Sequence, residues 1–214
     1  MDLGYIAIVI GVILVSMILH EVMHGLTAYA LGDDTAKMQG RLTLNPIKHI
    51  DPFLTIILPV LLAISGGPIF GGAKPVPFNP ARLKYDEWGA ALVAISGPLT
   101  NLVIAFVAYG ATVIVSGGSG AGLAGGLLQM ILMLTVTINL GFFVFNMIPL
   151  PPLDGSRVLY ALAPEFVRRG MEAIERFGII FVFAIVLLAG PLLFEFMGEA
   201  INFFLNIFAA IFGA

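Results

Sequence analysis

Long apolar stretches dominate this chain and leave its polar residues gathered in a few intervals. Apolar segments lie at 3–30, 52–70, 88–115, 127–149, 177–194 and 197–213. Polar stretches at 31–51, 71–87 and 150–176 separate them, and 116–126 is a short uncharged connection rich in Gly and Ser. A membrane-spanning helix needs roughly 20 mostly apolar residues. The pattern therefore predicts an all-α polytopic membrane protein with about five to six transmembrane or re-entrant segments, forming a single integral-membrane domain over 1–214.

The composition agrees with the prediction of a membrane protein and excludes several functions. Of the 214 residues, 59% are hydrophobic and 11% charged, and the mean hydropathy is +1.04. No basic tract is present to bind nucleic acid, and the chain has no cysteine. A metal site in this protein must therefore use His, Asp, Glu or Asn. The start, Met1-Asp2-Leu3, lacks the basic residues of a cleaved signal peptide, so we expect none.

The cations indicate how the chain crosses the membrane. All ten Lys and Arg residues fall in the three polar stretches, and cationic loops stay in the cytoplasm. If 52–70 spans the bilayer, three of the cations lie on one side of the membrane and seven on the other. If 52–70 is re-entrant, all ten share one side. Pro59, Gly66, Gly67 and Pro68 suit a re-entrant turn, so we favour that reading, with the N-terminus outside and the ends of 3–30 and 127–149 near the cytoplasmic boundary.

The candidate chemistry begins at residues 20–24, His-Glu-Val-Met-His, at the end of the first apolar run. Two His residues four apart lie one turn apart on one face of a helix, where both can reach a single metal ion. Glu21 follows His20 and is close enough to act on a water at that metal. Ionisable residues in an apolar helix are costly in lipid and usually mark function. This H-E-x-x-H pattern indicates metal-assisted peptide hydrolysis.

A catalytic zinc usually has three protein ligands, and the best third candidate is Asp154. It follows the apolar run 127–149, after Pro149, Pro151 and Pro152, which break a helix and set an extended arm. Gly155 allows a sharp turn. The alternative is that Asp154 caps a helix at 156–163; taken alone, that alternative would be the better one.

Three motifs together resemble the site-2 protease family of intramembrane zinc metalloproteases, in its short form without PDZ or regulatory domains. They are H-E-V-M-H at 20–24, G-P-L-T-N at 97–101 and N-M-I-P-L-P-P-L-D-G at 146–155, and the match covers nearly the whole chain in order. The resemblance implies Zn²⁺ as cofactor, His20, His24 and Asp154 as its ligands, and Glu21 as the general base. Asn146 belongs to the same motif as Asp154, with a less definite role.

Three further side chains have two interpretations each. Asn101 and Asn146 are candidate catalytic residues, because an amide donor stabilises a developing oxyanion. Either could instead bond a helix terminus beside proline. His49 is a fourth ligand or an interfacial contact, and the contact is favoured because three ligands already complete a catalytic site.

An extended substrate is held best at a sheet edge. Residues 37–45 alternate polar and apolar side chains from Arg41 to Asn45, and 73–80 carries three prolines. We expect a small β element there on the cytoplasmic side, with an ordinary interfacial loop as the alternative.

These observations predict an intramembrane zinc endopeptidase in a prokaryotic cell membrane. It would cut single-span transmembrane protein substrates within the lipid bilayer near its cytoplasmic face, in regulated proteolysis or in clearance of membrane peptides. One rival is a catalytically inactive adaptor that binds membrane helices, but an adaptor has no need of Glu21. Another is a metal transporter, which predicts ionisable residues strung across the membrane, whereas 88–115 has none. The sequence does not indicate an oligomeric state.

Overall fold

The computed structural model describes residues 3–51, 74–117 and 123–213, and these residues are largely helical. Four long helices are apolar enough to cross a membrane: α1 (Leu3–Ala30), α4 (Asp86–Gly117), α5 (Leu123–Asn146) and α8 (Ile179–Phe212). The short elements are α2 (Thr35–Met38), η1 (Pro46–Lys48), η3 (Pro80–Arg82), α6 (Asp154–Leu162) and α7 (Glu165–Glu175). The prediction of an all-α integral membrane protein is confirmed at this level.

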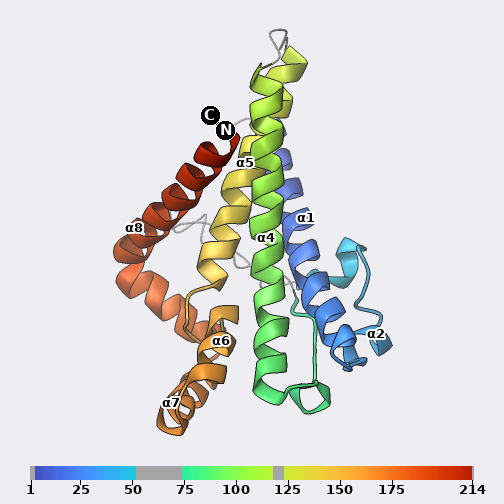
Figure 1. The fold of residues 1–214 in the computed structure, drawn as a ribbon, viewed down its shortest axis with the longest axis vertical. Coiled ribbons are helices and arrows are strands. Elements are labelled where there is room, and N and C mark those ends of the chain that lie inside the picture. The colour runs from blue at the N-terminus through green and yellow to red at the C-terminus, as the bar shows by residue number, and fades with distance from the viewer. Residues whose placement is uncertain (1–2, 52–73, 118–122, 214) are drawn as a thin grey trace.

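Helix α4 is the central element and packs against α1, α5 and α6. Figure 1 shows α1 and α5 running in the same direction, with α4 antiparallel to both. This is the arrangement expected from the predicted course of 3–30 and 127–149. Because the two helices run together, the His pair near the end of α1 and the segment that follows α5 reach the same depth.

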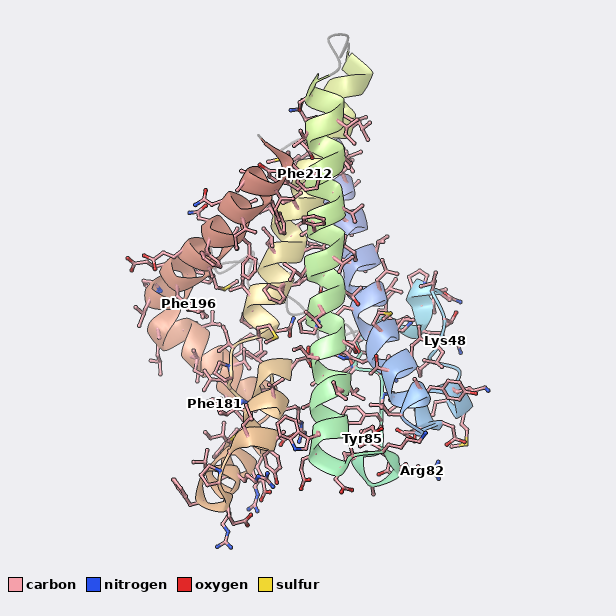
Figure 2. The ribbon with its side chains drawn as sticks, in the orientation of Figure 1. Lys48, Arg82, Tyr85, Phe181, Phe196 and Phe212 are labelled. Atoms are coloured by element: carbon pink, nitrogen blue, oxygen red, sulfur yellow. The ribbon has the colours of Figure 1, made fainter. Side chains whose placement is uncertain are left out.

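Small residues let these helices approach closely. The buried residues of α4 include Gly89, Ala90, Ala94, Gly97, Ala105 and Ala108. One apolar cluster joins α4, α5 and α8 through Ala105, Val136, Leu140 and Phe208. Figure 2 shows Phe212 at the end of α8 near α4, where a Cβ on Gly110 would meet the Phe212 ring at 2.6 Å. Close packing through small residues is typical of helices in lipid, where burial alone supplies little driving force.

The short polar elements gather at the end of the bundle where α1 finishes and α4 begins (Figure 1). The backbone N–H of Lys74 donates to the carbonyl of His49 at 2.8 Å, so the polar stretches 31–51 and 71–87 meet each other. Arg82 pairs with Asp34 there, and Arg168 with Glu87. The segment predicted to be re-entrant, 52–70, lies outside the described residues.

The structure does not confirm the predicted number of segments. The apolar runs 177–194 and 197–213 both fall within α8, which consists of two helical stretches joined across a kink and bends visibly in Figure 1. Ala189 has non-helical angles (φ −123°, ψ 17°) two residues before Pro191. Proline lacks the N–H for the helical hydrogen bond and its ring crowds the preceding turn, which accounts for a kink at this place. Four candidate spans are found among the described residues, and the count of five to six is not confirmed.

The predicted small β element is not found either. Among the described residues no strand forms, and 41–45 makes bends that lead into η1. The two predicted strands do lie close together, but the Arg41 side chain joins them by donating to the carbonyls of Lys74 (2.6 Å) and Pro75 (3.2 Å). Pro75 and Pro77 have no N–H to give to a β ladder, which removes the donors that strand pairing needs. The interfacial loop, left open as the alternative, describes this region.

Buried Asp33 fixes the turn after α1. Its carboxylate accepts hydrogen bonds from the Thr35 backbone N–H (3.0 Å), the Thr35 hydroxyl (2.5 Å) and the Asn79 N–H (2.6 Å). Burial raises the pKa of this carboxyl, but the hydrogen bonds from Thr35 and Asn79, with Arg82 nearby, outweigh it and hold the pKa below 3.8. The charged form is therefore the form that stabilises the link between 33–35 and 79.

We expect Asp33→Asn to lower the free energy of unfolding by about 1–3 kcal/mol at pH 7, because an amide cannot accept all three bonds. The folded pKa is below the unfolded value, so the contribution of the charge is present above about pH 4 and is lost as the pH falls through the folded pKa. Unfolding in detergent should thus show a difference in the free energy of unfolding between parent and variant that is constant at pH 5–7 and becomes smaller below about pH 4. Asp34→Asn, which removes only a half-exposed ion pair, is the matched control and should shift stability by at most about 1 kcal/mol. A gap for Asp33→Asn that is independent of pH would contradict the assignment.

Candidate metal centre

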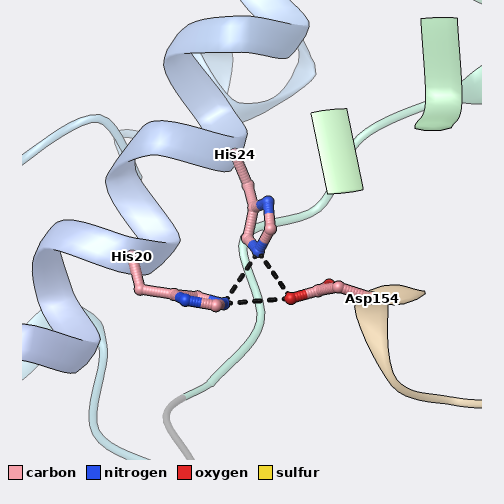
Figure 3. Close-up of side chains that lie close together, drawn as sticks. All are labelled: His20, His24 and Asp154. Carbon is pink, nitrogen blue, oxygen red and sulfur yellow. Dashed lines mark hydrogen bonds and ion pairs between the residues drawn. The ribbon is translucent and has the colours of Figure 1, made fainter. Parts of the chain in front are cut away.

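Three side chains converge between α1 and the start of α6. The Nε2 atoms of His20 and His24 lie 3.0 Å apart, and the Asp154 Oδ2 lies 3.1 Å from the first and 3.3 Å from the second. Figure 3 shows the two rings and the carboxylate pointing toward one another. Both His residues are buried, and Asp154 is half-buried. The sequence-predicted ligand set is thus brought together within one small volume.

The donor set fits zinc. Two imidazoles and one carboxylate are the ligands of many catalytic zinc sites, which leave a fourth position open. Zinc bonds of about 2.0–2.1 Å in tetrahedral geometry place the donor atoms about 3.4 Å apart. The observed separations of 3.0–3.3 Å are close to that value. Very small shifts of the side chains would therefore seat one ion.

The other nitrogen of each ring is bonded to α4. The Nδ1 of His20 lies 2.6 Å from Asn101 Oδ1, and the Nδ1 of His24 lies 2.7 Å from the backbone carbonyl of Val93. A carbonyl can only accept, so the His24 Nδ1 carries the proton and its Nε2 keeps a lone pair. Such contacts fix which nitrogen faces a metal.

Gly97 leaves room for the two rings. A Cβ at this position would lie 2.5 Å from His24 Cε1 and Nε2 and 2.7 Å from His20 Nε2. Those distances are too short for any side chain, so only glycine lets α4 approach the pair. The first Gly of the G-P-x-x-N motif thus has a steric reason in this fold.

Asp154 is the first residue of α6, with Leu153 at the cap position. The Asp154 carboxylate therefore lies at the start of a helix and also faces the His pair. A position at the helix start is thus compatible with a role as metal ligand. Residues 147–153, with their prolines, connect α5 to this point. A Cβ on Gly155 would lie 2.3 Å from the Met147 carbonyl, so glycine is needed where the chain turns back on itself.

Glu21 is held from outside α1. Its Oε2 accepts a hydrogen bond of 2.8 Å from the Val76 backbone N–H. Val76 also packs close to α1, since a Cβ on Gly25 would come within 2.9 Å of it. The extended stretch after Lys74 therefore lies along the helix face that presents Glu21, and it orients the carboxylate.

The remaining candidates are not part of the metal-binding group itself. The Asn146 side chain donates to the Phe142 carbonyl of its own helix at 3.0 Å. His49 contacts the Thr43 carbonyl through Nε2 at 2.8 Å, in agreement with the interpretation of a local contact. Asn101 is fully buried, and its contacts with His20 and Asn139 favour the supporting role over that of an oxyanion donor.

Sequence reasoning missed Asn139 and Ser16. Both are buried, and they continue the hydrogen-bonded chain from Asn101: Asn101 Nδ2 donates to Asn139 Oδ1, and Asn139 Nδ2 donates to Ser16 Oγ, each at 2.8 Å. A signal was available, because an Asn in the middle of an apolar helix cannot snorkel to water and must find a partner in the bundle.

Known proteins agree with this chemistry. The model of peptidase family M50 matches residues 7–127 and 120–190. YwhC of Bacillus subtilis (strain 168), named as a zinc metalloprotease, is 39% identical over 213 residues, covering 94% of this chain and 90% of the relative. Rip2 of Mycolicibacterium smegmatis, with the same kind of name, is 34% identical over 95% of this chain and 76% of its own length.

A shorter match comes from MJ0611 of Methanocaldococcus jannaschii, also named as a zinc metalloprotease, at 36% identity over 49% of this chain and 50% of the relative. No solved structure matches the chain. The zinc-fitting donor set, the apolar helices that carry it and the two long relatives all point the same way. The chain belongs to peptidase family M50, the site-2 protease family of zinc metalloproteases.

Proposed function

We propose that this protein is an intramembrane zinc endopeptidase that cuts single-span transmembrane substrates near the cytoplasmic face of a prokaryotic cell membrane. His20, His24 and Asp154 hold the zinc, and Glu21 is the general base. The observation that carries the proposal is a group of two buried imidazoles, on a helix long enough to cross a bilayer, with the half-buried Asp154 carboxylate at the start of α6. Its relatives named as zinc metalloproteases come from bacteria and an archaeon.

The position of the His pair along α1 supports cleavage within the membrane. His20 is 17 residues beyond Leu3, which corresponds to about 26 Å of helix. The hydrocarbon core is about 30 Å thick. The metal group therefore lies inside the membrane layer, near the boundary where α1 ends.

The distribution of cations supports the cytoplasmic side. The polar elements that contain Lys and Arg gather at the end of the bundle nearest the metal group, as Figure 2 shows for Arg82, which lies at the opposite end from Phe212. Cationic segments next to membrane helices are retained in the cytoplasm. The N-termini of α1 and α5 then begin on the outer side.

Each residue has a defined part in the proposed reaction. Bound zinc supplies Lewis acidity to a water and to the scissile carbonyl. Glu21 accepts the proton of the attacking water and passes it to the leaving amine. The Val76 N–H holds one oxygen of the Glu21 carboxylate, which leaves the other oxygen for this proton. Asn146, whose amide has a second hydrogen, is the candidate donor to the developing oxyanion.

A helical substrate must unwind to reach this site, because its carbonyls are bonded within its own helix. Residues that weaken a helix, such as Gly or Pro near the scissile bond, should favour cleavage. The described residues offer no sheet edge at 41–45 to hold the unwound peptide, so the proposal does not depend on one.

The ligand assignment predicts the zinc content of single variants. His20→Ala and Asp154→Ala should each bind less than about a tenth of the zinc bound by the parent, because two ligands hold the ion poorly. His49→Ala is the matched control and should keep a full equivalent, since its ring contacts Thr43. Metal analysis of the purified proteins measures all three. Full zinc in Asp154→Ala would show that the third ligand is another residue.

Glu21→Gln tests both the base and the proteolytic function. The variant should keep its zinc and its melting temperature but cut a tagged single-span peptide at least about 100-fold more slowly, because an amide cannot accept the proton. The assay compares parent, variant and chelator-treated parent in detergent or vesicles. Cleavage within tenfold of the parent would remove Glu21 as the principal base. A parent that binds zinc and cuts none of a panel of membrane peptides would favour the adaptor.

The proposed orientation can be tested because the chain has no cysteine. Single cysteines at exposed Gln39, Lys84 and Arg169 should be protected from an impermeant thiol reagent in intact cells, whereas Ser116→Cys should be labelled from outside. All four should be labelled after lysis. Labelling of Lys84→Cys but not Gln39→Cys in intact cells would place the polar stretches 31–51 and 71–87 on opposite sides.

A further inference from the structure

A chain of buried amides leads from a backbone carbonyl of α5 to the metal-facing ring of His20. Asn139 Nδ2 lies 2.8 Å from the carbonyl of Thr135, one turn earlier in the same helix. Asn139 Oδ1 accepts from Asn101 Nδ2 at 2.8 Å, and Asn101 Oδ1 lies 2.6 Å from His20 Nδ1. Asn101 and Asn139 are both fully buried, so water does not compete for these bonds.

The direction of this chain is fixed at its start. A backbone carbonyl only accepts, so the Asn139 amide must turn its NH₂ toward Thr135 and Ser16 and its oxygen toward Asn101. Asn101 must then donate to Asn139, which turns its own oxygen toward His20. An oxygen at that place requires a proton on His20 Nδ1 and leaves the lone pair on Nε2, the atom that faces His24 and Asp154.

We infer that Asn139 is a positioning residue for the metal centre, which acts through Asn101 to hold His20 in its metal-binding tautomer. The inference rests on the proposed zinc site and extends it to a fourth helix, α5. Without Asn139, the Asn101 amide loses the partner that orients it and can turn its NH₂ toward His20. That arrangement would place the ring proton on Nε2, where it blocks the metal.

The matching contact on His24 explains why only one of the two His residues needs such a chain. His24 Nδ1 meets the Val93 carbonyl directly, which fixes its proton without any side chain. His20 instead meets an amide, which is symmetric in shape and can present either a donor or an acceptor. The further bonds to Asn139 and Thr135 remove that ambiguity.

The test compares three variants of α5 in the full-length protein. Asn139→Leu keeps the approximate volume but removes both polar atoms. We expect it to raise the zinc dissociation constant by about 10-fold, the lower end of the effect of losing a direct partner of a metal-bound His, because Asn139 acts through Asn101. Thr137→Val removes a hydroxyl from the exposed face of the same helix and should leave the constant unchanged. Competition against a chelator of known affinity measures the constants.

Asn139→Asp provides the conservative rescue. Burial favours the neutral acid, whose hydroxyl can donate to the Thr135 carbonyl while its other oxygen accepts from Asn101. We expect its zinc dissociation constant to stay within about threefold of the parent. A role in packing alone predicts the opposite order, with apolar Asn139→Leu tolerated better than a buried acid.

The parent protein supplies a measurement that does not depend on whether any Asn139 variant folds. In protein labelled with ¹⁵N-His and loaded with zinc, the His20 signal, identified by its loss in His20→Ala, should show a protonated Nδ1. A proton on Nε2 would overturn the inference, as would unchanged zinc affinity in folded Asn139→Leu. A parent that binds no zinc, or that binds it fully in His20→Ala, would instead refute the proposed metal site on which this inference rests.

Discussion

Buried polar groups in an apolar bundle must satisfy one another, and that constraint organises this protein. A buried imidazole or amide is shielded from water, so leaving it without a hydrogen-bond partner costs free energy unless a neighbouring helix supplies one. His20 and His24 on α1 find their partners on α4, and Asn101 of α4 finds Asn139 on α5. The same contacts that satisfy these groups also fix the register of three helices. The metal centre and the helix packing are thus one set of interactions.

Much of this arrangement could be predicted from the sequence because its signals are local. The apolar run 3–30 corresponds to α1 residue for residue, since a helix that spans lipid must satisfy its own backbone and must be long and apolar. The four-residue spacing of His20 and His24 sets their common face on any helix. If all cationic stretches lie on one side of the membrane, the runs 3–30 and 127–149 must both end on that side, so α1 and α5 run in the same direction. The segment after α5 then brings Asp154 to the His pair.

What could not be predicted depends on contacts between distant segments. Alternation in 41–45 suggested a strand, but strand formation needs a partner with N–H donors, and the neighbouring stretch has Pro75 and Pro77. The apolar runs 177–194 and 197–213 both lie within α8, but its backbone leaves helical geometry at Ala189, two residues before Pro191, and not at the predicted boundary between the runs. The bond from the Val76 N–H to Glu21 has no sequence signal, since every residue but proline carries that donor.

The residues around the site combine close packing of the helices with enough space for two imidazole rings. The nitrogen donors of the two zinc-binding rings must be held about 3 Å apart, which requires tight packing around the rings. An imidazole ring is large, however, and two helices packed through large side chains would lie too far apart for the second helix to hydrogen-bond the ring. Gly97 on α4 leaves space for both rings, because a Cβ at this position would lie 2.5–2.7 Å from their atoms. Val93, one turn earlier, then lends its carbonyl to His24, and Asn101, one turn later, lends its amide to His20. Because the ligands come from α1 and α6 while their supports come from α4 and α5, no pair of helices can form the site alone. Zinc bound here would therefore stabilise the association of all four elements, and loosening any one of them would weaken the site at a distance.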